Sequence, residues 1–151
     1  DAKAPMNAPL PAALLDTNVV LDVLLARAPF AAAANACMLQ VEDGLLRGYL
    51  GATTVTTLDY LLANALDAKT SRQHLARMLD LFEVAGVNRA VLAAALGSNQ
   101  KDVEDAVLVE AARAAGVPNI ITRNAKDFVG CGLAVFTPVE WLAGGAIAPL
   151  R

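Results

Sequence analysis

The chain has 151 residues, a length typical of one domain with a proper hydrophobic core. Its composition, 56% hydrophobic and 18% charged, excludes an intrinsically disordered chain. The formal net charge of −3 argues against a protein that grips nucleic acid by bulk positive charge, but not against an enzyme that acts on nucleic acid through bound metal ions. Since no apolar run approaches the roughly 18 to 20 residues that span a bilayer, we expect no membrane partner.

The cysteines and the histidine indicate no thiol or histidine chemistry. Cys37 and Cys131 lie far apart without CxxC spacing, so neither a disulfide framework nor a zinc site is indicated. We expect both to be buried, reduced thiols of a cytoplasmic protein. The only histidine, His74, lies in a polar helical stretch, which argues against a Ser-His-Asp apparatus.

The apolar pattern alternates between strands and helices along the chain. Residues 1–11 contain three prolines and are expected to form a flexible N-terminal segment, while 12–151 form one domain. Strands are expected over 12–15, 48–52, 82–85, 119–122 and 134–136. Helices are expected over 18–27, 30–42, 53–66, 71–81, 88–96 and 102–115, and a short one around Trp141. This alternation predicts an α/β fold with a parallel sheet covered by helices on both faces.

Asp16 stands directly after the first apolar strand, at the sheet edge where open α/β folds place their ligands. A carboxylate beside so much aliphatic surface costs free energy unless a cation or hydrogen-bond donors compensate it. The alternative is that Asp16 merely turns the chain or caps the next helix.

Other acidic residues recur where strands end or helices begin. If the sheet brings these strand ends together, several carboxylates face one cleft, and mutual repulsion should raise at least one pKa. Such a cluster favours hard cations, Mg²⁺ or Mn²⁺, and metal-assisted hydrolysis of a phosphodiester. In the alternative reading, Asp102 is a helix N-cap and Asp105 a partner of the helix dipole. The acids concerned, besides Asp16, are Asp59, Asp102, Asp105 and Asp127.

Three motifs in this order resemble the PIN-domain nucleases, a family that includes the VapC-like toxins of bacterial toxin–antitoxin pairs. They are Leu14 to Asn18, Val103 to Ala106 and Ile121 to Phe128. The resemblance runs from about Ala12 to Leu142. It implies a three-layer α/β/α sandwich with a central parallel sheet, a Mg²⁺- or Mn²⁺-dependent endoribonuclease, a frequent homodimer and, for toxin members, a neutralising antitoxin partner.

Carried over from this family, Asp16 and Asp105 match its first and third carboxylates. The second family acid is usually a glutamate, and Asp59 is the nearest candidate, although another alignment puts Thr57 there and leaves Asp59 out. The fourth position is the neutral Asn124, for which Asp127 stands in directly or through water. Thr17, Asn18 and Thr54 match small polar positions that hold the carboxylates in the family. Beyond this match, Asp102 or Asp127 would support a second, weaker metal ion. Arg123 and Lys126, close to the acids, would contact substrate phosphates or else are ordinary surface charges.

One alternative function fits the sequence, and a second is disfavoured by it. The neutral Asn124 and the uncertain second acid are also compatible with a degenerate PIN domain that binds RNA or protein without cleaving. A phosphotransfer domain would need an acid at position 18, where the chain has Asn18. Self-association is expected from the apolar segment 30–39 and from a helical face of Leu75, Met78, Leu79 and Phe82, unless these faces are simply core.

Overall fold

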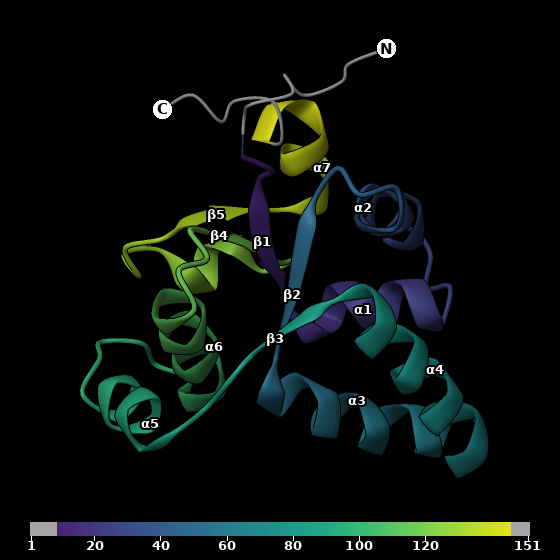
Figure 1. Ribbon diagram of the computed structural model, residues 1–151, viewed down its shortest axis with the longest axis horizontal. Coiled ribbons are helices and arrows are strands. Elements are labelled where there is room, and N and C mark those ends of the chain that lie inside the picture. The colour runs from purple at the N-terminus through teal and green to yellow at the C-terminus, as the bar shows by residue number, and fades with distance from the viewer. Residues whose placement is uncertain (1–8, 146–151) are drawn as a thin grey trace.

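Five parallel strands form one sheet at the centre of the computed structural model, which describes residues 9–145 (Figure 1). The strand order is β3-β2-β1-β4-β5, and every neighbouring pair is parallel. The expected parallel sheet is therefore confirmed, whereas residues 1–8 of the predicted N-terminal segment lie outside the described residues. The strands are β1 (Ala12–Leu15), β2 (Arg47–Gly51), β3 (Glu83–Ala85), β4 (Asn119–Ile121) and β5 (Ala134–Phe136).

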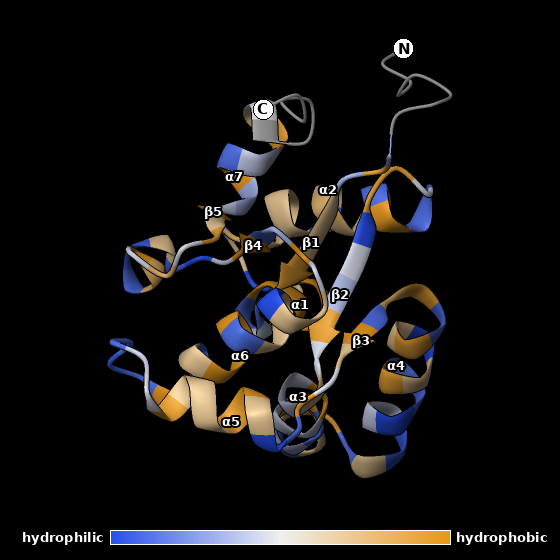
Figure 2. Ribbon diagram, turned by 60° about the vertical axis from the view of Figure 1, so that its left-hand side comes forward, coloured by the Kyte–Doolittle hydropathy of each residue, from blue (hydrophilic) through white to orange (hydrophobic). Residues whose placement is uncertain are grey.

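β1 is the middle strand, and its aliphatic sequence explains that place. Ala13 and Leu15 pack into one hydrophobic cluster and Leu14 into another, because successive side chains of a strand point to opposite faces. All three are fully buried, as a parallel strand covered on both sides requires. Figure 2 shows β1 in hydrophobic colours inside the molecule.

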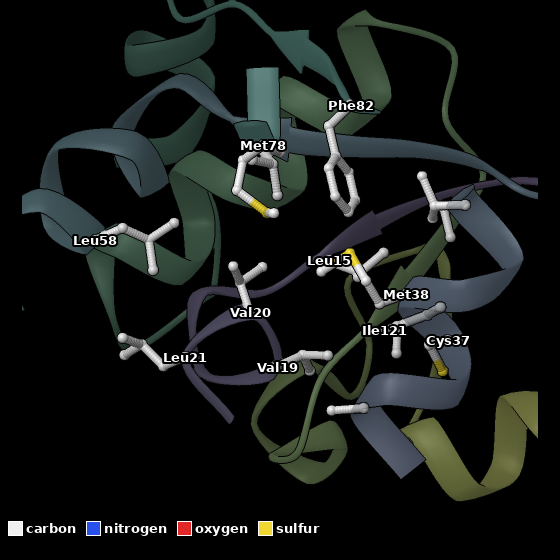
Figure 3. Close-up of a cluster of buried hydrophobic side chains, with 14 of the residues drawn as sticks. Leu15, Val19, Val20, Leu21, Cys37, Met38, Leu58, Met78, Phe82 and Ile121 are labelled. Carbon is white, nitrogen blue, oxygen red and sulfur yellow. The ribbon is translucent and has the colours of Figure 1, made fainter. Parts of the chain in front are cut away.

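Helices cover both faces of the sheet and complete the expected three-layer sandwich. The larger layer contains α1 (Thr17–Leu24), α2 (Ala31–Glu42), α3 (Ala52–Ala65), α4 (Ala68–Leu81) and α7 (Pro138–Glu140). Its core joins Leu15 and Ile121 of the sheet to side chains such as Val20, Met38 and Met78 (Figure 3). The other layer contains α5 (Arg89–Leu96) and α6 (Val103–Ala114), which pack on the Leu14 side of β1.

Helix boundaries differ from the sequence-based ones where local capping decides them. α1 ends at Leu24 rather than at 27, because Ala26 takes a left-handed φ of 51° that reverses the chain. α4 begins at Ala68 rather than at 71, since the Asp67 side chain accepts a hydrogen bond from the Thr70 N–H and serves as its N-cap. The expected loop after β4 contains a 3₁₀ turn, Ala125–Phe128.

The helical face proposed for self-association is mostly core. Leu75, Met78 and Phe82 are buried, and only Leu79 of this face is exposed, at 51%. Between 30 and 39, Phe30 and Leu39 are exposed while the intervening helix buries Ala34, Cys37 and Met38. The expectation of a continuous apolar surface at α4 is therefore wrong, because α4 packs this face against α3 and the sheet.

Two further sequence-based expectations concern the thiols and the membrane. Both cysteines are free; Cys37 is buried as expected, but Cys131 is only half-buried. Within residues 9–145, no helix combines the length and apolar character needed to cross a bilayer.

Candidate active site

Asp16 lies at the carboxyl end of β1 and is the N-cap of α1, as the capping alternative expected. Its Oδ1 accepts the Thr17 N–H at 2.7 Å, and its Oδ2 accepts the Thr122 hydroxyl at 2.8 Å and the Asn18 amide at 3.4 Å. The residue is 7% exposed. Burial raises the pKa of Asp16 above its ordinary value, while the hydrogen bonds from Thr122 and Thr17 offset part of that rise.

The start of α6 brings further carboxylates to the same edge of the sheet. Asp102 is its N-cap and accepts the Asp105 N–H at 2.9 Å, as the capping interpretation expected. α6 comes close because β2 ends in Gly51, where a Cβ atom would collide with Leu108 of this helix. Asp105, in the first turn, is half-buried beside these acids.

Two of the carboxylates at this edge, those of Asp16 and Asp105, have raised pKa values, partly because of the negative charges around them. The pKa of Asp105 is raised to about 6, first by burial and then by the negative charges of Asp16, Asp102, Asp127 and Glu104. This direction agrees with the expectation that repulsion between carboxylates raises at least one pKa, although burial contributes more than repulsion does. Among residues 9–145, no lysine or arginine forms an ion pair with Asp16 or Asp105. The carboxylates of Asp16 and Asp105 are therefore not paired with a cation of the described part of the chain.

Two members of this site were not identified from the sequence. Thr122 holds Asp16 through its hydroxyl, which also accepts the Asn124 N–H at 3.1 Å. Glu104 contributes negative charge to both Asp16 and Asp105. Their signal in the sequence was position alone, since Thr122 lies at the carboxyl end of an expected strand and Glu104 precedes Asp105 in the acidic motif.

Asp59, the predicted second acid, is not brought to these carboxylates. Its Oδ1 accepts the hydroxyl of the buried Ser71 at 2.7 Å, which ties α3 to α4. Thr57 instead lies near α6, with its hydroxyl 3.4 Å from Glu104 Oε2. Residues two apart in a helix point about 200° apart, so Asp59 faces away when Thr57 faces α6. The alternative alignment, with Thr57 at this position, is the one that the geometry favours.

The small polar residues of the predicted site link its elements. The Thr17 hydroxyl donates to that of Thr54 at 3.1 Å and joins α1 to α3. Asn18 donates to Asp16 and accepts the Arg123 N–H at 3.3 Å. Thr54 is buried, while Thr17 and Asn18 are half-buried.

In the loop after β4, three polar side chains are exposed, whereas the Arg123 side chain packs against other elements. Asn124, Lys126 and Asp127 are exposed, and Asp127 is close enough to raise the pKa of Asp105. The Arg123 guanidinium turns away from this loop: its Nε lies 3.0 Å from Asp22 Oδ2, and its Cζ is 4.0 Å from the centre of the Phe30 ring.

The donor chemistry of this edge fits a hard divalent cation, because it offers carboxylate, hydroxyl and amide oxygens in an uncompensated negative field. Asp16, Asp105 and Glu104 would be the charged ligands, with Asp102 and Asp127 at the rim. In the described part of the chain, no three acidic, histidine or cysteine side chains are already arranged around one point as a metal group. Side-chain rotation would therefore accompany ion binding.

Comparison with known proteins defines the family. A family model described as PIN domain matches residues 12–126. The chain belongs to the PIN-domain family, as the ordered motifs implied. A search of curated protein sequences found no match to this chain.

Solved structures share the fold across most of the chain. A chain from a toxin–antitoxin complex of Klebsiella pneumoniae is 23% identical, with a TM-score of 0.65 over 85% of this chain and 98% of that one. A chain of FitAcB from Neisseria gonorrhoeae is 24% identical, with a TM-score of 0.64 over 85% and 99%. VapBC2 from Rickettsia felis, bound to a DNA fragment from its promoter, gives 13% identity and a TM-score of 0.61 over 82% and 96%.

Proposed function

We propose that this protein is an endoribonuclease that hydrolyses RNA phosphodiester bonds with Mg²⁺ or Mn²⁺. The observation that carries the proposal is the gathering of several carboxylates at the carboxyl edge of the sheet. Burial first, and the negative charges of these neighbours second, raise the pKa of Asp105 to about 6. Helix capping and the helix dipole account for acids in the first turn of α6, but they do not require these acids to lie within range of Asp16. A divalent cation relieves this repulsion and is bound more tightly the more negative charge surrounds it.

The residues have distinct roles in this proposal. Asp16 and Asp105 bind the ion directly, and Thr122 and the Thr17 N–H keep the Asp16 carboxylate oriented. When bound, the ion supplies an activated water and stabilises charge on the leaving oxygen. In the same proposal, Asp102, Asp127 and Asn124 bind an additional, weaker ion or its water.

RNA and protein partners follow from the same proposal. Lys126 is exposed next to the site and can contact a substrate phosphate, as can the terminal nitrogens of Arg123. The similar structures include a toxin–antitoxin complex, which supports a toxin role with a neutralising antitoxin partner for this chain. A homodimer and a cytoplasmic location belong to this proposal as well.

A second candidate is a PIN domain that binds RNA or protein without cleaving. Two observations favour it: the fourth position is the neutral, exposed Asn124, and the position nearest Glu104 on α3 is Thr57 instead of an acid. This version of the site has fewer carboxylates to hold an ion than the family pattern.

Titration calorimetry with Mn²⁺ and cleavage of a labelled oligoribonucleotide test both candidates. We expect wild type to bind Mn²⁺, and Asp16→Asn to lose more than about 100-fold in affinity, beyond the loss typical of an outer hydrogen bond. Asp59→Asn is the matched control, since it removes the same charge away from the site. Binding without Mn²⁺-dependent cleavage would select the second candidate, and no Mn²⁺ binding by wild type would sink the first.

A further inference from the structure

A second buried aspartate, Asp22 of α1, is paired with two arginines beside the carboxylate site. Its Oδ1 accepts the Arg27 Nε–H at 2.9 Å, and its Oδ2 lies 3.0 Å from Arg123 Nε without hydrogen-bond geometry. The Asp22 side chain is 1% exposed, while those of Arg27 and Arg123 are 38% and 28% exposed. One arginine suffices to neutralise a buried carboxylate, so the second leaves a net positive charge at the surface.

The chain path shows how this arrangement forms. Ala26 adopts a left-handed φ of 51°, a conformation that costs a non-glycine residue about 1–2 kcal/mol. The reversal lets the Arg27 N–H donate to the Asp22 carbonyl at 3.0 Å and returns the Arg27 side chain to the Asp22 carboxylate. Arg123 belongs to the loop after β4, and its backbone N–H donates to the Asn18 side chain.

Arg123 is fixed on two further sides. Its guanidinium carbon lies 4.0 Å from the centre of the Phe30 ring, within the range of a cation–π contact. Its backbone N–H is held by Asn18, which also contacts Asp16. These contacts use the backbone N–H, the Nε and the face of the guanidinium. Within residues 9–145, its two terminal nitrogens make no hydrogen bond, and they are the part of the fork that recognises a phosphate.

We propose that Asp22 and Phe30 are positioning residues that hold the Arg123 guanidinium as an anchor for a phosphate of the RNA chain, next to the carboxylates. The proposal rests on the proposed ribonuclease function for the identity of the ligand. Arg27 adds charge to the same anchor, and its Nη2 lies 3.5 Å from the Asn18 carbonyl. Because a guanidinium reads phosphate and not sugar, single-stranded DNA of the same sequence should depend on the anchor equally.

Binding of a fluorescein-labelled single-stranded oligoribonucleotide, measured by anisotropy in EDTA over a range of salt concentrations, tests the anchor without metal or cleavage. Arg123→Gln should raise Kd and reduce the slope of log affinity against log salt by about 0.7, the value for one lost contact to a single strand. Arg77→Gln is the matched control: it removes the same charge from α4, where Arg77 pairs with Glu42.

Conservative variants distinguish the orientation of the Arg123 guanidinium from its charge. Arg123→Lys keeps the charge but loses the planar stack, and should weaken binding nearly as much as Arg123→Gln. Phe30→Leu, at a half-exposed position that the fold tolerates, should weaken binding while Phe30→Tyr restores it. Asp22→Asn should behave like Phe30→Leu, and if it fails to fold, the Phe30 pair decides.

Several outcomes would overturn the anchor. The first is that the wild-type protein does not bind the oligoribonucleotide. The second is that Arg123→Gln has the same Kd as the control Arg77→Gln. The third is that Arg123→Lys and Phe30→Leu both have the Kd of wild type. Unchanged RNA affinity in Arg123→Gln would assign the guanidinium to another ligand, such as a carboxylate of a protein partner. A Mn²⁺ titration of the same variants keeps the two proposals distinct, since Arg123 and Phe30 variants should bind Mn²⁺ as wild type does.

Discussion

Asp16 and Asp22 are both buried aspartates of one helix: Asp16 caps the N-terminus of α1, and Asp22 lies within it. The charged groups around the two side chains are opposite in sign. Asp22 meets two guanidinium groups, whereas Asp16 meets a backbone N–H, a hydroxyl and an amide. Other carboxylates surround Asp16, and their charges help raise its pKa. Burial alone therefore does not distinguish an acid that holds the fold from an acid that binds a cation; the sign of the neighbouring charges does.

This comparison explains why the fold tolerates an uncompensated acidic edge. The core on both faces of β1 is apolar and independent of these acids, so stability comes from burial of residues such as Leu14 and Leu15. The carboxylates stand at the strand ends, where hydrogen-bond donors of Thr17 and Thr122 offset part of the desolvation. Removing acids from the two groups should accordingly have opposite effects on stability.

The largest expected effect on stability comes from Asp22. Asp22→Asn removes the charge that holds Arg27 and Arg123 and should lower the free energy of unfolding by about 2 kcal/mol, the usual range for a lost hydrogen bond to a charged group. Urea unfolding of wild type and variant without metal measures it. If the variant is as stable as wild type, the ion pairs of Asp22 with the two arginines do not stabilise the fold. Asp22 and Asp16 would then not differ in their contribution to stability.

Asp105 should show the opposite sign together with a pH dependence. Its pKa is about 6 in the folded protein against 3.8 ordinarily, so between pH 4 and 6 the folded state binds more protons than the unfolded state. The free energy of unfolding should therefore fall as pH rises through this window and level off above it. Asp105→Asn should flatten that fall and, above pH 6, gain up to about 1 kcal/mol after allowance for its solvent exposure.

Thermal melts at several pH values, with and without Mn²⁺, measure the Asp105 effect. Mn²⁺ should stabilise wild type increasingly as pH rises past 6, because it binds the ionised native site. Asp105→Asn should lose most of this shift. A helix-dipole role predicts instead that the variant is less stable without metal, by about 0.3–1 kcal/mol. That result, combined with no metal shift in wild type, would remove the basis for a cation site.

The helices, strands and acidic residues whose positions follow from local sequence pattern could be predicted from the sequence. The apolar run before Asp16 fixes a strand and the position of its carboxylate, and Asn88 and Asp102 cap the helices that follow them. The role of Asp22 could not be inferred in this way, because its partner Arg123 is distant in sequence. The chain reversal that brings Arg27 back to Asp22 depends on the left-handed backbone conformation of Ala26. Alanine disfavours this conformation, so the sequence did not predict it.

The second acid shows most clearly where local pattern is insufficient. Thr57 and Asp59 are both polar residues of one helix, and the sequence does not determine which of the two faces α6. Packing decides it: α3 buries Leu58 and Leu62, and α4 supplies Ser71 as the partner of Asp59. A shift of two residues therefore changes a predicted metal ligand into a link between two helices.

The smallest expected effect tests that reassignment. Asp59→Asn keeps an oxygen for the Ser71 hydroxyl and should lower the free energy of unfolding by only about 0.5 kcal/mol, the low end for a hydrogen bond. It should leave Mn²⁺ affinity unchanged, because the charge removed does not lie among the carboxylates that raise the pKa of Asp105. Thr57→Val is the informative counterpart, since it removes the hydroxyl that lies near Glu104 without changing charge. Calorimetry should show weaker Mn²⁺ binding for Thr57→Val than for Asp59→Asn. The reverse order would return Asp59 to the metal site and require α3 to rotate when the ion binds.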